Sequence, residues 1–316
     1  MFAVIGSTTV DVVVHSPDRL PQVDGDEFTS NSLVFTDDPL QFMPGGNGAN
    51  SACVLAALGA ETALCSAVGN DPLGGMMLQW LEEVGVGLAS LKQEVSESTS
   101  STTIISAGRT RLSFHHPGAL KSYARQDLPG HLPASADVLL VCSYPLLRAW
   151  RPGGYEDVLR AAHANGVVTA LDIGPAVGDP VRLEELRPML PHVDYFVCNS
   201  LELETCTGSE DLIRGMIDVA DAGASNVITK LGPRGAAVLP HGGKEPSVVP
   251  GFSVQERGTV GAGDSFNAGL LYALLQGRPL LDAVRFGNAV AGLVIASPLG
   301  VMVAPTVEEV DRKLNG

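Results

Sequence analysis

Apolar segments typical of β-strands alternate with helical segments through the second half of the chain, and this alternation restricts the fold more than any other feature. A helical segment is expected at 155–165, and strands are expected at 137–142, 167–172, 195–199, 226–230 and 236–239. Apolar strands connected by helices form parallel sheets that helices cover on both faces. The sequence therefore predicts an α/β fold, with three α/β/α layers around a mostly parallel central sheet.

The first half of the chain departs from this alternation in two places. Residues 15–44 are polar and contain several prolines, and residues 99–123 have the pattern of a hairpin around Ala107-Gly108-Arg109. Short strands of this kind leave the main sheet instead of extending it. We therefore expect these segments to form strands away from the main sheet, and the length of the chain would allow one large domain or two.

A glycine-rich segment at 258–269 has the pattern of a loop that turns into a helix. Its glycines let the backbone N–H groups of Ala262, Gly263 and Asp264 point at one anion, which the helix dipole also attracts. The segment Gly261–Asp264 is therefore a candidate phosphate site.

Asp264 is the only charged residue between Gly258 and Arg278. A carboxylate beside the positive end of a helix dipole stays ionised, so it can accept a proton from a hydroxyl while the amides hold a phosphoryl group. Aspartate is also a preferred helix cap. The two interpretations, a catalytic base and a cap, both stay open at this point.

Further candidate binding residues lie near the N-terminus. Asp11 interrupts a run of β-branched residues, and because a buried carboxylate needs a partner, we expect it at a ligand site or a strand end. Gly45 and Gly46 allow the backbone to approach a ligand closely, and Asn47 and Asn50 offer donors and acceptors to hydroxyl groups. An edge-strand aspartate and a glycine turn with a capping asparagine are the simpler alternatives.

Polar residues also follow the expected strands of the main sheet. Asn199 ends one strand, Lys230 ends another, and Asp264 follows the last of them. Ligands of parallel sheets bind beyond the carboxyl ends of the strands. We therefore expect these three residues along the same edge of the sheet.

The glycine-rich segment and the glycine pair together resemble the two signatures of the ribokinase-like carbohydrate kinases, the PfkB family. Its D-T-x-G-A-G-D pattern is matched at Thr259, Gly261, Ala262, Gly263 and Asp264, and its G-G-x-x-x-N pattern at 45–50. The resemblance implies a ribokinase-like fold and ATP-dependent transfer of the γ-phosphoryl group to a hydroxyl, expected to be a primary one, of a free sugar. It also implies a single domain that spans residues 1–316, in which the segments 15–44 and 99–123 form a small β-sheet lid over the sugar. Two chains would form a homodimer through this lid.

The resemblance implies a role for each matching residue. Asp264 would be the catalytic base beside the anion hole Gly261–Asp264, and Asn199 with Glu202 would hold Mg²⁺ through water, with Glu204 as a competitor for this role. Substrate contacts would come from Asp11, Gly45, Gly46, Asn47, Asn50 and Ser143. Contacts to ATP would come from Lys230, Gly232 and Asn288.

Three positions depart from the family pattern. Gly258 stands where the family often carries an aspartate that helps to hold a monovalent cation, so activation by K⁺ is not expected. Ribose-specific members tend to carry lysine where Asn47 stands and glutamate after the strand that here leads into Cys142-Ser143. Ribose is therefore not assigned as the substrate.

Other functions stay open. A nucleoside kinase of the same fold is the nearest alternative, and a non-catalytic sugar or nucleotide sensor would have no need of Asp264. Phe114, His115 and His116 either face the sugar or lie on the hairpin surface. A phosphosugar kinase needs positive charge, which the chain carries around the second excursion at Arg109, Arg111, Lys121 and Arg125. A dehydrogenase is disfavoured, because the first strand-to-helix turn lacks the glycines of a dinucleotide site.

Composition excludes further classes of protein. The net charge of −15 disfavours nucleic acid and anionic membranes as partners, and no apolar stretch reaches the ~20 residues of a membrane span. The five cysteines show no metal-binding spacing, and an odd number of them without a signal sequence is typical of the reducing cytoplasm. We expect a cytoplasmic enzyme with buried thiols.

Overall fold

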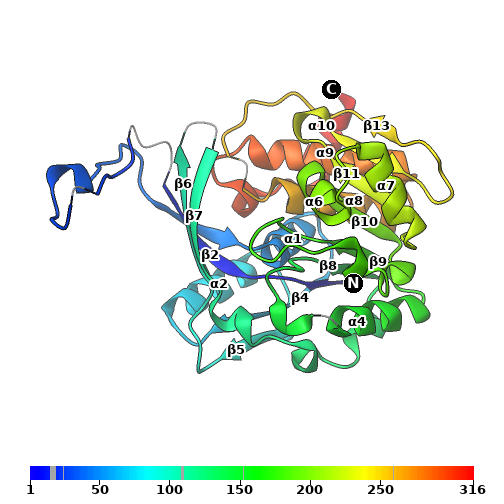
Figure 1. The fold of residues 1–316 in the computed structure, drawn as a ribbon, viewed down its shortest axis with the longest axis horizontal. Coiled ribbons are helices and arrows are strands. Elements are labelled where there is room, and N and C mark those ends of the chain that lie inside the picture. Colours follow the sequence, from blue (N-terminus) through cyan, green and yellow to red (C-terminus); the bar gives the residue numbers. More distant parts are fainter. Residues whose placement is uncertain (15–18, 24, 108–109, 152, 259) are drawn as a thin grey trace.

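The computed structural model describes residues 1–14, 19–23, 25–107, 110–151, 153–258 and 260–316. Its centre is a nine-stranded sheet in the order β13-β12-β11-β10-β9-β8-β1-β4-β5 (Figure 1). The strands are β1 (Phe2–Ile5), β4 (Thr62–Gly69), β5 (Leu91–Glu94), β8 (Val138–Val141), β9 (Val168–Asp172), β10 (Tyr195–Asn199), β11 (Asn226–Lys230), β12 (Ala236–Leu239) and β13 (Ser247–Val249). Neighbours from β11 to β5 pair in parallel, and β12 and β13 add antiparallel strands at one edge. The predicted mostly parallel sheet is confirmed.

Helices cover both faces of this sheet. Alternate residues of a strand point to opposite faces, so β1 directs Ala3 and Ile5 into one apolar core and Phe2 and Val4 into another. The first core is covered by α3 (Leu132–Ser135), α4 (Gly153–Ala164), α5 (Leu183–Leu186), α6 (Ser200–Thr207) and α7 (Leu212–Asp221). The second is covered by α1 (Asn47–Ala57), α2 (Pro72–Glu83), α8 (Ala262–Leu275), α9 (Leu280–Ile295) and α10 (Val307–Asn315). The three-layer α/β/α prediction is therefore confirmed.

A separate four-stranded sheet stands beside the main sheet, in the order β3-β2-β6-β7 (Figure 1). Its strands are β2 (Thr9–Val14), β3 (Gln41–Gly45), β6 (Ser101–Ala107) and β7 (Thr110–His116). The small second sheet was predicted, but it begins earlier than residue 15, because the β-branched residues of β2 already belong to it. We call these four strands the small sheet.

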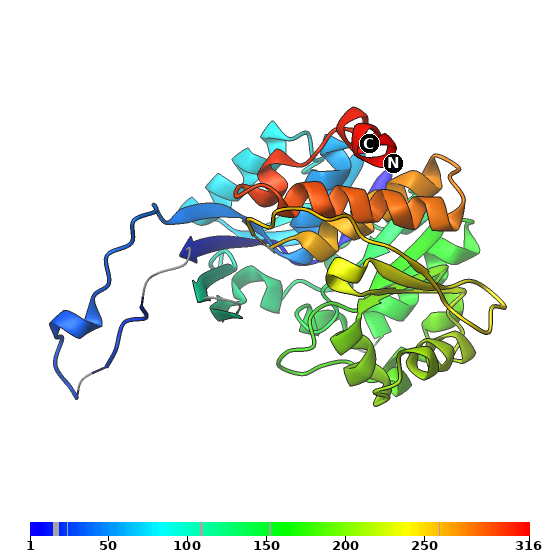
Figure 2. The same cartoon turned by 90° about the horizontal axis from the view of Figure 1, so that it is seen from above.

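Residues 19–40 form a long extension from the small sheet. Their described part contains the short helix Ser30–Ser32 but no strand of its own, although short strands were expected there. Figures 1 and 2 show this extension projecting well beyond the body of the protein. Its apolar side chains Val23, Phe28 and Phe35 are at least 80% exposed. The extension therefore has no core of its own.

The five cysteines are free and buried, as expected from their apolar neighbours. Burial raises the pKa of the Cys53, Cys65 and Cys206 thiols to about 12, and it also raises the pKa of Cys142 and Cys198. Uncharged thiols act as small apolar groups in the core. In the described part of the chain, no helix is long and apolar enough to span a membrane.

The helices α8 and α9 pack closely because glycines face each other at their contact. A Cβ atom added to Gly269 would lie 2.8 Å from Cγ2 of Val290 and 3.0 Å from Cα of Gly287. A Cβ atom added to Gly287 would in turn lie 2.8 Å from the carbonyl oxygen of Phe266. This close contact fixes the position of α8, whose first turn carries Asp264.

We expect Gly269→Ala to lower the free energy of unfolding by about 1–3 kcal/mol, because the added methyl group overpacks the α8–α9 contact. Gly75→Ala in α2 is the matched control: its added Cβ meets nothing within 4 Å, so alanine should stabilise the helix by about 0.5–1 kcal/mol. Chemical denaturation of the three proteins measures both changes. Equal stability of Gly269→Ala and the wild type would contradict the described packing.

Candidate active site

Asp264 lies in the first turn of α8, where it is only 6% exposed. Its Oδ1 accepts a hydrogen bond from Nδ2 of Asn47, and its Oδ2 accepts one from Nδ2 of Asn50, both at 2.8 Å. Burial raises the pKa of the Asp264 carboxyl, and these two amide donors act in the opposite direction. Three residues predicted from the two signatures thus meet in one cluster.

The start of α8 carries no side-chain cap. Gly261 is the N-cap, with φ at 79°, and its carbonyl accepts the first helical hydrogen bond from Ser265 N at 2.9 Å. The amides of residues 262–264 precede this bond and have no partner within the helix. Asp264 is thus not the cap, although a cap was one interpretation of its position. An uncapped helix start beside a carboxylate suits an anion held next to a base.

Asp11 and the glycine pair fit closely together. Asp11 in β2 is 4% exposed, and a Cβ atom on Gly45 of β3 would overlap its carboxylate. Gly46 has φ at 87°, and a Cβ atom there would lie 2.5 Å from the carbonyl oxygen of Ser7. Both glycines are therefore required, Gly45 by the carboxylate and Gly46 by the backbone.

Ser143 fixes the orientation of the Asn47 side chain through a hydrogen bond. Its hydroxyl donates to Oδ1 of Asn47 at 3.0 Å and lies 2.8 Å from Oγ of Ser7. With its carbonyl oxygen occupied, Asn47 directs its NH₂ group to Asp264. Ser143 is fully buried and has φ at 62°, the only positive φ of a non-glycine residue in the described part of the chain. Such backbone strain is typical of functional sites.

Asn50 offers an acceptor to a ligand. The residue is 3% exposed, its Nδ2 is bonded to Asp264, and its Oδ1 has no hydrogen-bond partner among the described residues. A buried acceptor without a partner costs about 1–3 kcal/mol. A hydroxyl group bound beside Asp264 would recover this free energy, so the site fits a polyhydroxylated ligand.

Asn199 and Glu202 form a reciprocal cap at the start of α6. Glu202 N donates to Oδ1 of Asn199 at 2.9 Å, and Asn199 N donates to Oε2 of Glu202 at 2.7 Å. Burial and the negative charge of Asp172 raise the pKa of Glu202 to about 7. A bound cation would favour the ionised carboxylate, so the position fits Mg²⁺ beside phosphates. Glu204 is exposed, whereas Glu202 is buried.

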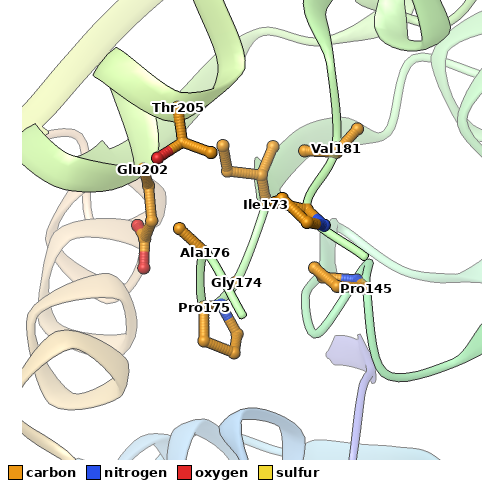
Figure 3. A pocket seen from close by; sticks show the side chains of 9 residues that line it. Pro145, Ile173, Gly174, Pro175, Ala176, Val181, Glu202 and Thr205 are labelled. Atoms are coloured by element: carbon orange, nitrogen blue, oxygen red, sulfur yellow. The ribbon is translucent and has the colours of Figure 1, made fainter. Parts of the chain in front are cut away.

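Glu202 also borders a small pocket behind the end of β9 (Figure 3). Figure 3 shows its carboxylate facing the Gly174–Ala176 segment. The pocket is lined by Pro145, Ile173, Gly174, Pro175, Ala176, Pro180, Val181, Glu202 and Thr205. Because most of these side chains are apolar, little water surrounds the carboxylate, which accounts for its raised pKa.

Lys230 ends β11 but points inward. Its Nζ lies 2.6 Å from Oδ2 of Asp172, the last residue of β9, and 3.4 Å from Oδ1 of Asn267 in α8. Asn267 donates to the same Asp172 oxygen at 2.6 Å, and Gly174 N donates to the other at 2.7 Å. Although burial opposes its charge, the surrounding carboxylates raise the pKa of Lys230. The lysine is therefore a fixed positive charge.

This positive charge lies directly beside the anion hole. A Cβ atom added to Gly263 would be 3.2 Å from Nζ of Lys230. The resemblance implies that Lys230 contacts ATP, and the structure places its Nζ beside the first turn of α8. Asp172 and Asn267 were not predicted. Asp172 carries the same signal as Asn199 and Lys230, a polar residue that ends a parallel strand.

The remaining predicted positions lie around this cluster. Gly232 follows β11 with φ at 61° and open space around it. Asn288 in α9 donates both amide hydrogens to the carbonyls of Val249 and Pro250, at 3.2 Å each, so it anchors the chain after β13. Thr259, from the glycine-rich signature, lies outside the described residues.

Two of the four cations considered for a phosphosugar, Lys121 and Arg125, are described, and neither lies on the small sheet that carries Asp11. Lys121 lies in the short helix Gly118–Lys121, which packs against β4, and Arg125 lies beside Gly154 of α4. Arg109 and the side chain of Arg111 are outside the described part of the structure. Around Asp11 and Asp264, the described groups are carboxylates, amides and hydroxyls together with the ammonium group of Lys230.

Comparison with known proteins places this chain among the carbohydrate kinases. The profile of the pfkB family carbohydrate kinases matches residues 1–306. Ribokinase from Haemophilus influenzae is 28% identical over 313 residues, which cover 97% of this chain and 95% of that protein. The ATP-dependent ribose-1-phosphate kinase of Halopiger xanaduensis is 27% identical over 305 residues, 93% of this chain and 91% of the relative. The structure of Arabidopsis thaliana ribokinase complexed with ribose and ATP has a TM-score of 0.83 at 22% identity, over 100% of this chain and 98% of that one.

The family match and the named relatives define this chain as a phosphotransferase that acts on an alcohol group. The chain belongs to the pfkB family of carbohydrate kinases, as its two signatures indicated.

Proposed function

We propose that this protein is an ATP-dependent kinase that transfers the γ-phosphoryl group to a hydroxyl, by preference a primary one, of a free sugar. The observation that carries the proposal is the position of Asp264, held by Asn47 and Asn50 at 2.8 Å beside the uncapped start of α8. Asp264 accepts the proton of the attacking hydroxyl. The amides of residues 262–264 hold the transferring phosphoryl group.

The groups around the base support a neutral sugar as the acceptor. Asp11 and the free Oδ1 of Asn50 are suited to hydroxyl donors, and Lys230 is already paired with Asp172 at 2.6 Å. Asn199 and Glu202 would hold Mg²⁺ through water, and that ion neutralises phosphate charge when bound. A reducing compartment, the cytoplasm, suits the free cysteines.

We expect Asp264→Asn to lower turnover by ~10²-fold or more, because the variant keeps the size of the side chain but loses the base. Folding should be retained: Asn50 can rotate its amide and use its unpaired Oδ1 to accept from the new NH₂ group. ADP release with a panel of free sugars, phosphosugars and nucleosides measures turnover, and thermal melting measures folding. A folded Asp264→Asn variant with near-normal turnover would refute the role of Asp264.

The same panel separates the alternatives. A nucleoside or a phosphosugar as the preferred acceptor of the wild type would replace the free-sugar assignment by a nucleoside kinase or a phosphosugar kinase. Wild-type protein that binds a sugar but releases no ADP would indicate a non-catalytic sensor.

We also propose that the reaction does not depend on K⁺. Position 258 carries no carboxylate, and its amide lies 3.3 Å from the carbonyl oxygen of Ile295. A carboxylate at this position would supply negative charge to a bound K⁺. Because that charge is missing, activity at saturating Mg²⁺ should change by less than about twofold when K⁺ is replaced by a large organic cation at constant ionic strength. A steep K⁺ activation curve would show that other oxygen atoms complete a cation site. A Cβ atom at Gly258 meets nothing within 4 Å, so Gly258→Asp is the variant that should then strengthen the dependence.

We propose, third, that the small sheet is a lid through which two chains form a homodimer. Strand register places Phe42, Val12, Thr103 and Phe114 in one row on the face opposite to Asp11. Phe42 is 48% exposed and Phe114 70% exposed. An exposed apolar sheet face of this kind supports association with a second copy.

We expect the wild type to have the molar mass of a dimer in light scattering and Phe114→Asp to shift it toward that of a monomer, because a charge would be buried in the contact. Val95→Asp is the matched control, since Val95 is 82% exposed but lies after β5 of the main sheet. A monomeric wild type at micromolar concentration would contradict the dimer.

A further inference from the structure

Three polar side chains form a hydrogen-bonded row across the small sheet. Oγ1 of Thr9 lies 3.4 Å from Oγ1 of Thr102, and Oγ1 of Thr102 lies 3.1 Å from Nδ1 of His115. Thr9 belongs to β2, Thr102 to β6 and His115 to β7. The row therefore connects the strand of Asp11 with the outermost strand of the sheet.

Strand register puts this row on the face of Asp11. Asp11 is paired with Thr102, and Thr102 with His115, and directly paired residues point to the same face. The neighbours of His115 in β7, Phe114 and His116, point to the opposite face.

The face of Asp11 is also the one that looks toward the anion hole. Val13, Met43 and Ile104 lie on this face and pack together with Val260, which precedes the start of α8. Thr102 and His115 lie in the row of Asp11. This row is two residues before Val13 in β2 and therefore closer to the main body. Of Phe114, His115 and His116, only His115 therefore points to the face that carries Asp11, where the sugar is proposed to bind.

The order of the strands determines which part of a ligand His115 can reach. β3 and β7 are the opposite edges of the small sheet, and β3 leads through Gly45 and Gly46 into the Asn47–Asn50 turn that holds Asp264. Two strand spacings, together about 10 Å, separate β2 with Asp11 from β7 with His115. A sugar ring with hydroxyl groups on both sides can bridge that gap.

His115 has one ring nitrogen available for a ligand. Its Nδ1 is bonded to Thr102, and its Nε2 has no hydrogen bond among the described residues. Partial burial and the adjacent His116 lower the pKa of His115, so the imidazole is neutral at neutral pH and its two nitrogens have opposite donor and acceptor roles.

We infer that His115, positioned by Thr102, binds a hydroxyl of the acceptor sugar through Nε2, at the end of the sugar away from the hydroxyl that Asp264 deprotonates. This inference rests on the proposed sugar kinase activity and adds a specificity residue to it. The ligand it implies is an uncharged polyol with hydrogen-bonding groups at both ends.

Two amide variants separate the ring nitrogens. The polar atoms of asparagine occupy the position of Nδ1, and those of glutamine reach the position of Nε2. With the best sugar of the panel, His115→Asn should raise the KM for sugar roughly tenfold, and His115→Gln should stay within about threefold of the wild type, because only glutamine keeps the bond to the sugar. The KM for ATP and kcat should change by less than about twofold in both variants.

His116→Asn is the matched control, since His116 is the next residue of β7 but lies on the opposite face, and its sugar KM should be unchanged. Deoxy analogues of the sugar then identify the hydroxyl: the analogue without it should bind equally well to the wild type and to His115→Asn. Melting temperatures verify that all variants are folded.

An unchanged sugar KM in folded His115→Asn would overturn the inference, and so would an equal loss in His115→Asn and His115→Gln. The panel of acceptors is assayed with the wild type before any variant is compared. A wild type that phosphorylates a nucleoside or phosphosugar in place of a free sugar would instead overturn the proposed function.

Discussion

The hydrogen bonds from Asn47 and Asn50 to Asp264 are the interaction on which the rest of the site depends. They join α1 to α8, so the carboxylate is positioned only when the two ends of the chain have come together. Each neighbouring feature supports this contact. Ser143 fixes the orientation of Asn47, and the glycine packing of α8 against α9 places the first turn that carries Asp264. The glycine pair before α1 brings the backbone close enough for Asn47 and Asn50 to reach the carboxylate.

Charge balance is the second constraint. Asp172, Glu202 and Asp264 lie within one buried region together with Lys230, which is paired with Asp172 and whose positive charge opposes the rise in the pKa of Glu202 and of Asp264. Three carboxylates cannot all be ionised there at low cost with a single cation. The excess of negative charge disfavours ionisation at Glu202, whose pKa is raised to about 7 by burial and by the negative charge of Asp172. A cation bound at Glu202 would relieve this excess of negative charge and favour the ionised carboxylate.

Much of this arrangement could be predicted from sequence, because it depends on local patterns. The strand and helix alternation gave the layers, and the glycine-rich segment with the glycine pair gave Asp264, Asn47 and Asn50. The Asp172–Lys230–Asn267 cluster could not be predicted in the same way, since the direction of a lysine at a strand end depends on which carboxylate lies beneath it. Ser143 orients Asn47 through a hydrogen bond, from a backbone with positive φ that no sequence pattern indicated. His115 could not be separated from Phe114 and His116 before the strand register was known, because a shift of one residue exchanges the two faces.

The buried cysteines can report when the folded structure opens, because their thiols become accessible to reagents only then. Cys53 lies in α1, Cys65 in β4, Cys142 just after β8, Cys198 in β10 and Cys206 in α6, so thiols are distributed over both faces of the sheet. A thiol whose pKa is raised toward 12 and that water cannot reach does not react with an alkylating reagent in the native state. Alkylation of a cysteine therefore shows that the layer covering it has separated from the sheet. The order in which the five cysteines are alkylated shows how cooperatively the two helical layers come apart.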